Sequence, residues 1–211
     1  MDESLEARWI ESARLGDEQA LSRLFEAHHA RLMRMVELRL DARLRRRLDP
    51  ADVVQEAWVE VLRRFGEWRT RDGLPFRVWL RLTTGQALVQ AQRRHLGADR
   101  RSQRREEQGF ASRSSVSAAN AADAFMASAT SPTQGAQREE LRTLVLAALE
   151  ELDEIDREIV ALRHFEGLSN EDAAAELSIE PAAASKRYMR ALLRLRPTLQ
   201  ALEPRNSGDV V

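Results

Sequence analysis

The 211-residue chain has no cysteine, which excludes a disulfide framework and any metal site built from thiolates. None of its four histidines has the spacing of metal ligands, and we expect neither a metal nor another cofactor. No apolar run approaches the length of a membrane span, and the first residues, Met1–Ser4, lack the basic region of a secretion signal. We therefore expect a cytoplasmic protein without membrane insertion.

The chain also lacks a strong charge of either sign. Its 33 basic and 34 acidic residues give a net charge of −1, which argues against a protein that coats DNA through bulk positive charge. Any binding to nucleic acid must therefore come from local patches. Aromatic residues make up only 5% of the chain, yet Trp58, Trp68 and Trp79 lie close together in the sequence.

Hydrophobic periodicity predicts an all-α protein, because no segment alternates as a strand does. Residues 1–97 are predicted to form one small helical domain and residues 134–204 a second, four-helix domain that contains a helix-turn-helix. Residues 98–133 are rich in Ser and Ala with few large apolar side chains, which indicates a flexible linker. Such a linker has an r.m.s. span of about 35 Å, comparable to one turn of DNA, although a plain spacer explains it as well. Residues 205–211 are expected to be a disordered tail.

Several helix boundaries follow from capping residues. Asp49 and Pro50 form a typical helix start, and this helix is predicted to end at Gly66. After a polar loop, a second helix is predicted from Pro75 to about His95. Asp153 is predicted to begin a helix in the second domain.

The most informative segment runs from Leu168 to Leu192. Ser169 can cap a short helix, a turn follows at 178–180, and Pro181 begins a second helix that is predicted to end at Pro197. One face of that second helix is apolar, and the other carries Lys186, Arg187, Arg190 and Arg194. A recognition helix requires this arrangement, because its charges neutralise phosphates and its first turns reach base edges in the major groove. Helical bundles also contain such pairs with a merely solvated basic face. The acidic residues of segment 150–158 stand apart from the basic stripe, and this segregation favours DNA binding.

Three segments together resemble the bacterial RNA polymerase sigma factors of the extracytoplasmic-function (ECF) type. Segment Asp49–Trp58 is similar to the family's helix that docks on the polymerase clamp. Segment Asp153–Leu195 is similar to the domain that reads the promoter −35 element, and Phe76–Leu80 resembles the start of the helix that helps to read the −10 element. Phrases at 94–98 and 183–188 resemble sigma factors of planctomycete-type bacteria.

The resemblance implies an alternative sigma factor, not an enzyme, that binds core RNA polymerase and directs promoter-specific initiation. The implied polymerase-binding residues are Asp52, Gln55, Glu56, Trp58 and Leu62, of which Asp52, Gln55 and Glu56 share one polar helix face. The residues expected to contact the opened −10 strand are Trp68, Arg69, Arg71, Arg77, Arg81, Thr84 and Gln86. Those expected to contact the −35 duplex are Ser185, Lys186, Arg187, Arg190 and Arg194. The implied partners are the clamp and flap of core RNA polymerase, promoter DNA, and an anti-sigma factor or a Ser/Thr kinase as regulator.

The chain departs from the family pattern at a few positions. Gln86 and Gln90 stand where Asn and Asp are common, and Ser185 stands where Lys is common. Ser178 replaces a turn glycine, which would cost about 1 kcal/mol if the turn requires positive φ.

Two rival functions remain. A stand-alone helix-turn-helix regulator would bind duplex DNA tightly without polymerase. A helical enzyme would need a phosphate-binding glycine loop, a metal cluster or a nucleophile–base pair, and we find none in the sequence.

Overall fold

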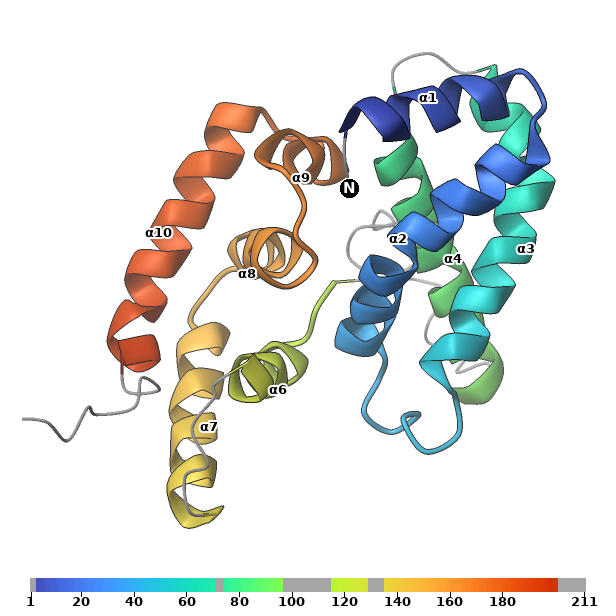
Figure 1. Cartoon of the computed structure of the whole chain (residues 1–211). Coiled ribbons are helices and arrows are strands. Elements are labelled where there is room, and N and C mark those ends of the chain that lie inside the picture. The colour runs from blue at the N-terminus through green and yellow to red at the C-terminus, as the bar shows by residue number, and fades with distance from the viewer. Residues whose placement is uncertain (1–2, 71–73, 97–114, 129–134, 201–211) are drawn as a thin grey trace, which may run out of the picture. The chain divides into compact units, whose positions relative to one another are not determined.

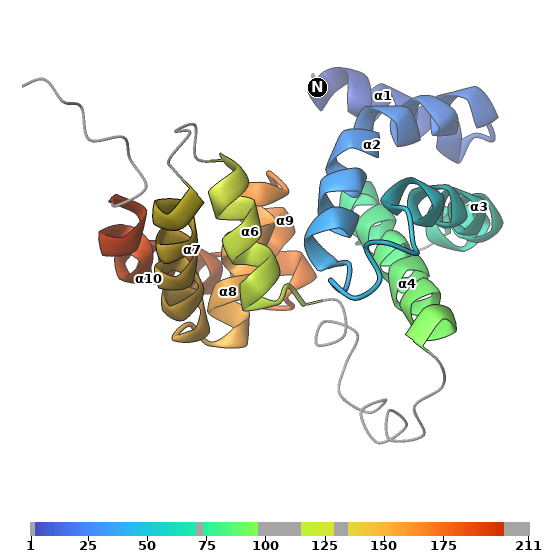
Figure 2. The same cartoon turned by 90° about the horizontal axis from the view of Figure 1, so that it is seen from below.

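The computed structural model describes residues 3–70, 74–96, 115–128 and 135–200, and all regular structure in these ranges is helical (Figures 1 and 2). The prediction of an all-α protein is therefore confirmed. The chain divides into two compact units, residues 1–114 and residues 115–211, which are described separately.

The first unit contains four described helices. In chain order they are α1 (Glu3–Arg14), α2 (Glu18–Arg39), α3 (Pro50–Arg69) and α4 (Phe76–Leu96). Helix α3 packs on α4 and α2, and α1 packs on α2 (Figure 1). Asp49 caps α3 as predicted, because its side chain accepts a hydrogen bond from the Ala51 N–H. The sequence pattern did not predict α1 as a separate helix.

Gly66 does not end α3, contrary to the prediction. The helix continues through it to Arg69, and part of the predicted loop is therefore helical. Phe65 and Trp68 are both buried on this stretch, so the additional turn brings Trp68 into the core. This burial offsets the low helix propensity of one glycine, which costs about 1 kcal/mol.

The core of the first unit is built around aromatic rings. Trp68 lies among Phe65, Phe76 and Trp79, with its ring centroid 5.6 Å from that of Trp79 and 5.3 Å from that of Phe76. Only 2% of Trp68 is exposed, and its Nε1–H donates a hydrogen bond to the Leu74 carbonyl oxygen at 3.0 Å. The apolar ring of Trp68 is therefore packed against other rings, and its N–H has a hydrogen-bond acceptor.

The second unit is also helical. Its elements are α6 (Ala118–Ser128), α7 (Gly135–Glu150), α8 (Glu154–Val160), the π-helical turn η2 (Ala161–Phe165), α9 (Asn170–Glu176) and α10 (Pro181–Gln200). Asp153 caps α8, and Ser169 caps α9, as predicted. Helix α10 does not end at Pro197 but continues to Gln200. Leu199 on this last turn is half-buried.

Helix α6 lies inside the segment predicted to be a flexible linker. It packs beside α7 (Figure 2). Its apolar residues Ala121, Ala122, Phe125 and Met126 are buried. The Phe125 ring lies 4.7 Å from that of Phe165. The structure thus corrects the linker prediction for residues 115–128. The low average hydrophobicity of segment 98–133 did not indicate this short alanine-rich helix. Its two large apolar residues are covered by α7 and η2. The remaining linker residues 98–114 and 129–133, and the tail 205–211, lie outside the described residues.

Candidate functional site

Helices α9 and α10 form the predicted helix-turn-helix. Alanines occupy the core between them, and Ala173, Ala174 and Ala184 are at most 1% exposed. Such small side chains let the two helices approach closely. The Asn170 side-chain amide also donates a hydrogen bond to the Pro181 carbonyl oxygen at 2.9 Å, which ties the start of α9 to the start of α10.

The turn between these helices requires a left-handed residue. Ser178 has a φ of +53°, and it stands where the resemblance described above implied a turn glycine. Its N–H and that of Ile179 donate to the carbonyl oxygens of Ala175 and Ala174, which closes the end of α9. The turn therefore does require a positive φ at Ser178, and serine adopts this conformation at a cost of about 1 kcal/mol.

All the residues predicted to contact the −35 duplex lie on α10. Ser185, Lys186, Arg190 and Arg194 are exposed, whereas Arg187 is half-buried. The opposite face carries Ala184, Ala191 and Leu195, which are fully buried. The basic and apolar faces of the helix are thus separated as predicted.

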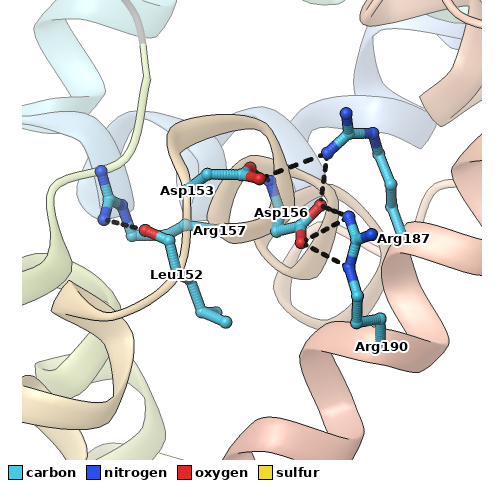
Figure 3. A network of polar contacts seen from close by, with 6 residues as sticks. All are labelled: Leu152, Asp153, Asp156, Arg157, Arg187 and Arg190. Carbon is cyan, nitrogen blue, oxygen red and sulfur yellow. Dashed lines mark hydrogen bonds and ion pairs between the residues drawn. The ribbon is translucent and has the colours of Figure 1, made fainter.

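Two of these arginines bind a buried carboxylate (Figure 3). Asp156 on α8 is 0% exposed, and its Oδ1 accepts from Arg187 Nη1 at 2.6 Å. Arg190 forms a two-pronged contact, with its Nε 3.1 Å and its Nη2 2.9 Å from Asp156 Oδ2. Arg187 Nη1 also lies 3.4 Å from the more exposed Asp153. The hydrogen bond to Asp156 raises the pKa of Arg187 above its already high ordinary value.

This network was not predicted from the sequence, in which the acidic residues of segment 150–158 stand apart from the basic stripe. The structure brings Asp153 and Asp156 onto that stripe. Arg157, the neighbour of Asp156, lies on the other side of α8 and donates to main-chain carbonyl oxygens. Figure 3 shows its contact with the Leu152 carbonyl oxygen, and it also donates to that of Leu149. No local signal in the sequence distinguishes the acid that faces α10.

The predicted polymerase-binding residues lie on α3, most of them at its surface. Asp52, Gln55 and Glu56 are exposed on one polar face, and Leu62 is 49% exposed. Trp58 differs, because it is half-buried and its ring lies 4.4 Å from that of Phe25 on α2. Its observed contact holds α3 against α2.

A hollow of about 280 Å³ lies between α3 and α4. Its lining residues are Glu56, Val59, Glu60, Gln86, Ala87, Gln90 and Arg94. Arg94 forms an ion pair with Glu56, and Gln86 accepts a hydrogen bond from Arg64. A predicted polymerase-binding residue, Glu56, and a predicted −10 residue, Gln86, therefore line the same hollow.

The structure corrects three of the residues predicted to contact the −10 strand. Trp68, Arg81 and Thr84 are at most 4% exposed. Thr84 donates its hydroxyl to the Leu80 carbonyl oxygen at 2.9 Å, and the Trp68 indole donates to Leu74. These side chains lie on the core faces of α3 and α4, where a DNA strand cannot reach them.

The remaining −10 residues that the structure describes lie on α3 and α4. Arg69 is exposed at the end of α3, Gln86 lies at the hollow, and Arg71 lies outside the described residues. Arg77 is half-buried, with its Nε 3.7 Å from the Glu6 carboxylate.

Glu6 on α1 is a further buried acid, which was not predicted from the sequence. The His28 Nε2 lies 3.3 Å from its Oε1. This hydrogen bond and, more weakly, the charge of Arg77 hold the pKa of Glu6 below its ordinary value, although burial acts in the opposite direction.

Within the described ranges, no three histidine or acidic side chains are grouped so that they could hold a metal ion. The helices described there include none with the length and apolar character of a membrane span.

Comparisons with known proteins find similar chains. A family model described as ECF sigma factor matches residues 4–200. The solved structure of CnrH, in complex with the cytosolic domain of CnrY, is 20% identical, with 93% of this chain and 98% of that chain covered and a TM-score of 0.52. The sigma factor RpoE, in complex with the anti-sigma factor NepR from Bartonella quintana, is 18% identical, with 87% and 98% covered and a TM-score of 0.47. No curated protein matches.

Proposed function

The chain belongs to the ECF sigma factor family, and from this premise we propose which of its surfaces perform each step of promoter recognition. It is an alternative sigma factor that directs promoter-specific transcription initiation. The observation that carries this conclusion is the match of the family model to residues 4–200, which includes both compact units.

The polar face of α3 is the proposed contact with the polymerase clamp. The exposure of Asp52, Gln55 and Glu56 supports this proposal, because these groups can pair with basic and polar groups of a partner helix. Exposed Leu62 adds an apolar contact on the same helix. Trp58 acts indirectly in this proposal, because its ring anchors α3 to α2.

The −10 strand is proposed to contact the end of α3 and the hollow beside α4. Arg69 supplies a cation for the phosphates, and Gln86 supplies amide groups for base edges. Arg77 adds a partly exposed cation whose charge Glu6 partly balances. Arg71 remains in the proposal from its sequence position alone.

The −35 duplex is proposed to bind α10 in its major groove. Lys186 and Arg194 suit contacts to phosphates, and Ser185, Arg187 and Arg190 lie on the turns that can reach base edges. The flap of polymerase is the proposed support that presents this unit to DNA.

Binding to core RNA polymerase followed by run-off transcription tests the proposal. The charge reversals Asp52→Arg and Glu56→Arg together should abolish capture by core polymerase and transcript formation. A matched control, Glu26→Arg with Glu37→Arg, changes the charge equally at two exposed positions of α2 and should retain both. Binding that survives the α3 reversal would exclude this face as the polymerase contact.

The rival function, a stand-alone helix-turn-helix regulator, predicts tight and specific binding of the isolated chain to duplex DNA. We propose instead that specific binding requires polymerase, since α10 presents few cations. The same assay with and without core polymerase separates the two.

We further propose that the factor acts in the cytoplasm and is not an enzyme. CnrH was solved with a protein partner, and an anti-sigma factor or a Ser/Thr kinase is the proposed regulator here. We propose a relationship to planctomycete-type sigma factors only on the basis of two short sequence segments, 94–98 and 183–188.

A further inference from the structure

We propose that Asp156 is a positioning residue of the recognition helix, which fixes Arg187 and Arg190 as one oriented pair for reading the −35 duplex. The inference rests on the proposed function of α10. It adds a residue of α8 that does not itself contact DNA but determines how two DNA-contacting residues are held.

The burial of Asp156 makes this contact obligatory. The carboxylate is 0% exposed and cannot be satisfied by bulk water, so the two arginines must neutralise it. Its two oxygens accept hydrogen bonds from Arg187 Nη1 and from Arg190 Nε and Nη2, at 2.6 to 3.1 Å (Figure 3). Two prongs on Arg190 define the plane of its guanidinium as well as its position.

Each arginine retains donors that Asp156 does not use. A guanidinium has five N–H groups, and these contacts leave Arg190 Nη1 and Arg187 Nε and Nη2 outside the carboxylate. The Arg190 side chain is 51% exposed and that of Arg187 30%. Both can therefore bind a phosphate or a base edge without leaving Asp156.

The contact with Asp156 lowers the net positive charge of this part of α10 but orients the two arginines. Two arginines and one carboxylate carry a net charge of +1, so the trio attracts any phosphate backbone less than two unpaired arginines would. In return, side chains that are already ordered lose less conformational entropy on binding, and their donors point in fixed directions. Lys186 and Arg194 on the same helix are exposed and have no ion pair within the part of the chain that the structure describes, so no carboxylate orients them.

The test uses Asp156→Asn in the full chain, reconstituted with core RNA polymerase. A −35 box is first selected with the wild-type holoenzyme from promoters randomised in that region, and binding to it is compared with binding to a scrambled box. Loss of the carboxylate should strengthen binding to the scrambled box at low salt and steepen the slope of log K against log salt by about 1, the value for one more neutralised phosphate. Discrimination between the two boxes should fall by about fivefold or more, the lower end of what an oriented arginine contributes.

Asp153→Asn is the matched control. It removes the same charge from the exposed partner of Arg187 and retains a good helix cap, so discrimination should change by less than about twofold. Asp156→Glu keeps the charge but displaces the carboxylate by one methylene. It should lower discrimination while leaving the salt slope unchanged, and it serves also if Asp156→Asn folds poorly.

The outcomes separate this inference from the proposed function. If Arg187→Ala and Arg190→Ala weaken promoter binding but both Asp156 variants discriminate as the wild type does, positioning by Asp156 is overturned. If the arginine variants themselves bind the selected box normally, the assignment of the −35 site to these residues fails.

Discussion

The two units stabilise their helices by different means. The first packs large aromatic rings, Phe65, Trp68, Phe76 and Trp79, into one cluster. The helix-turn-helix of the second has an interior of alanines, and the buried carboxylate of Asp156 joins α8 to α10.

This difference determines which predicted site residues remain at the surface. In the first unit, the ring cluster takes up Trp68, which has the chemistry of a base-stacking platform but lies in the core. In the second unit, alanines occupy the contact between α9 and α10, and the long basic side chains of α10 lie outside it. The small side chains between α9 and α10 therefore leave the predicted DNA-contacting residues of α10 at the surface, whereas the aromatic cluster of the first unit buries Trp68.

Trp68→Ala should produce the largest effect. Removing a fully buried indole from the ring cluster is expected to lower the free energy of unfolding of the first unit by about 3–5 kcal/mol. Urea unfolding followed by the fluorescence of the remaining tryptophans, all of which lie in residues 1–114, measures this change. Unchanged stability together with failed promoter opening would instead indicate that Trp68 contacts the −10 strand.

Replacing both Arg187 and Arg190 with Ala should be nearly as costly for the second unit. Asp156 would remain buried without a partner, at a cost of about 3 kcal/mol, the lower end for broken buried pairs because both arginines are partly in solvent. Adding Asp156→Asn should recover part of the loss. Circular dichroism should detect the change while tryptophan fluorescence does not, and an equal loss with and without Asp156→Asn would contradict the assignment.

Glu6→Gln tests the buried acid of the first unit, as the Asp156 variants test that of the second. At neutral pH the variant should be less stable by about 1–2 kcal/mol, since a hydrogen bond to a charged group is weakened. Because the folded-state pKa of Glu6 lies below its unfolded value, its contribution is complete above the ordinary glutamate pKa and disappears as the pH falls through the folded value. Stability should thus decline less steeply in acid for Glu6→Gln than for the wild type. Glu11→Gln, exposed on the same helix, should leave the profile unchanged.

Ser178→Gly should have the smallest effect and the opposite sign. Glycine adopts the φ of +53° without a Cβ clash, and the second unit should gain about 0.5–1 kcal/mol. Thermal unfolding by circular dichroism measures the gain. Ser185→Gly, inside α10, is the matched control and should lose about 0.5 kcal/mol, the difference in helix propensity between serine and glycine. A loss in both variants would indicate that the Ser178 side chain stabilises the turn.

Local features of the fold could be predicted from the sequence because their causes are local. Asp49, Asp153 and Ser169 each cap a helix through a main-chain N–H within three residues. The prediction failed where neighbours distant in sequence decide. Helix α6 depends on α7, and the additional turn of α3 depends on a core into which Trp68 can pack.

The candidate site divides in the same way. Periodicity alone determined the basic face of α10 and the polar face of α3, because the helical repeat fixes which side chains share a face. Only the tertiary structure decided that Asp156, 31 residues before Arg187, faces that stripe, whereas the adjacent Arg157 bonds to carbonyl oxygens elsewhere. Which acid meets which cation depends on how α8 and α10 pack, and that packing follows from the alanines between α9 and α10 and from Ile159 and Leu162 beneath them.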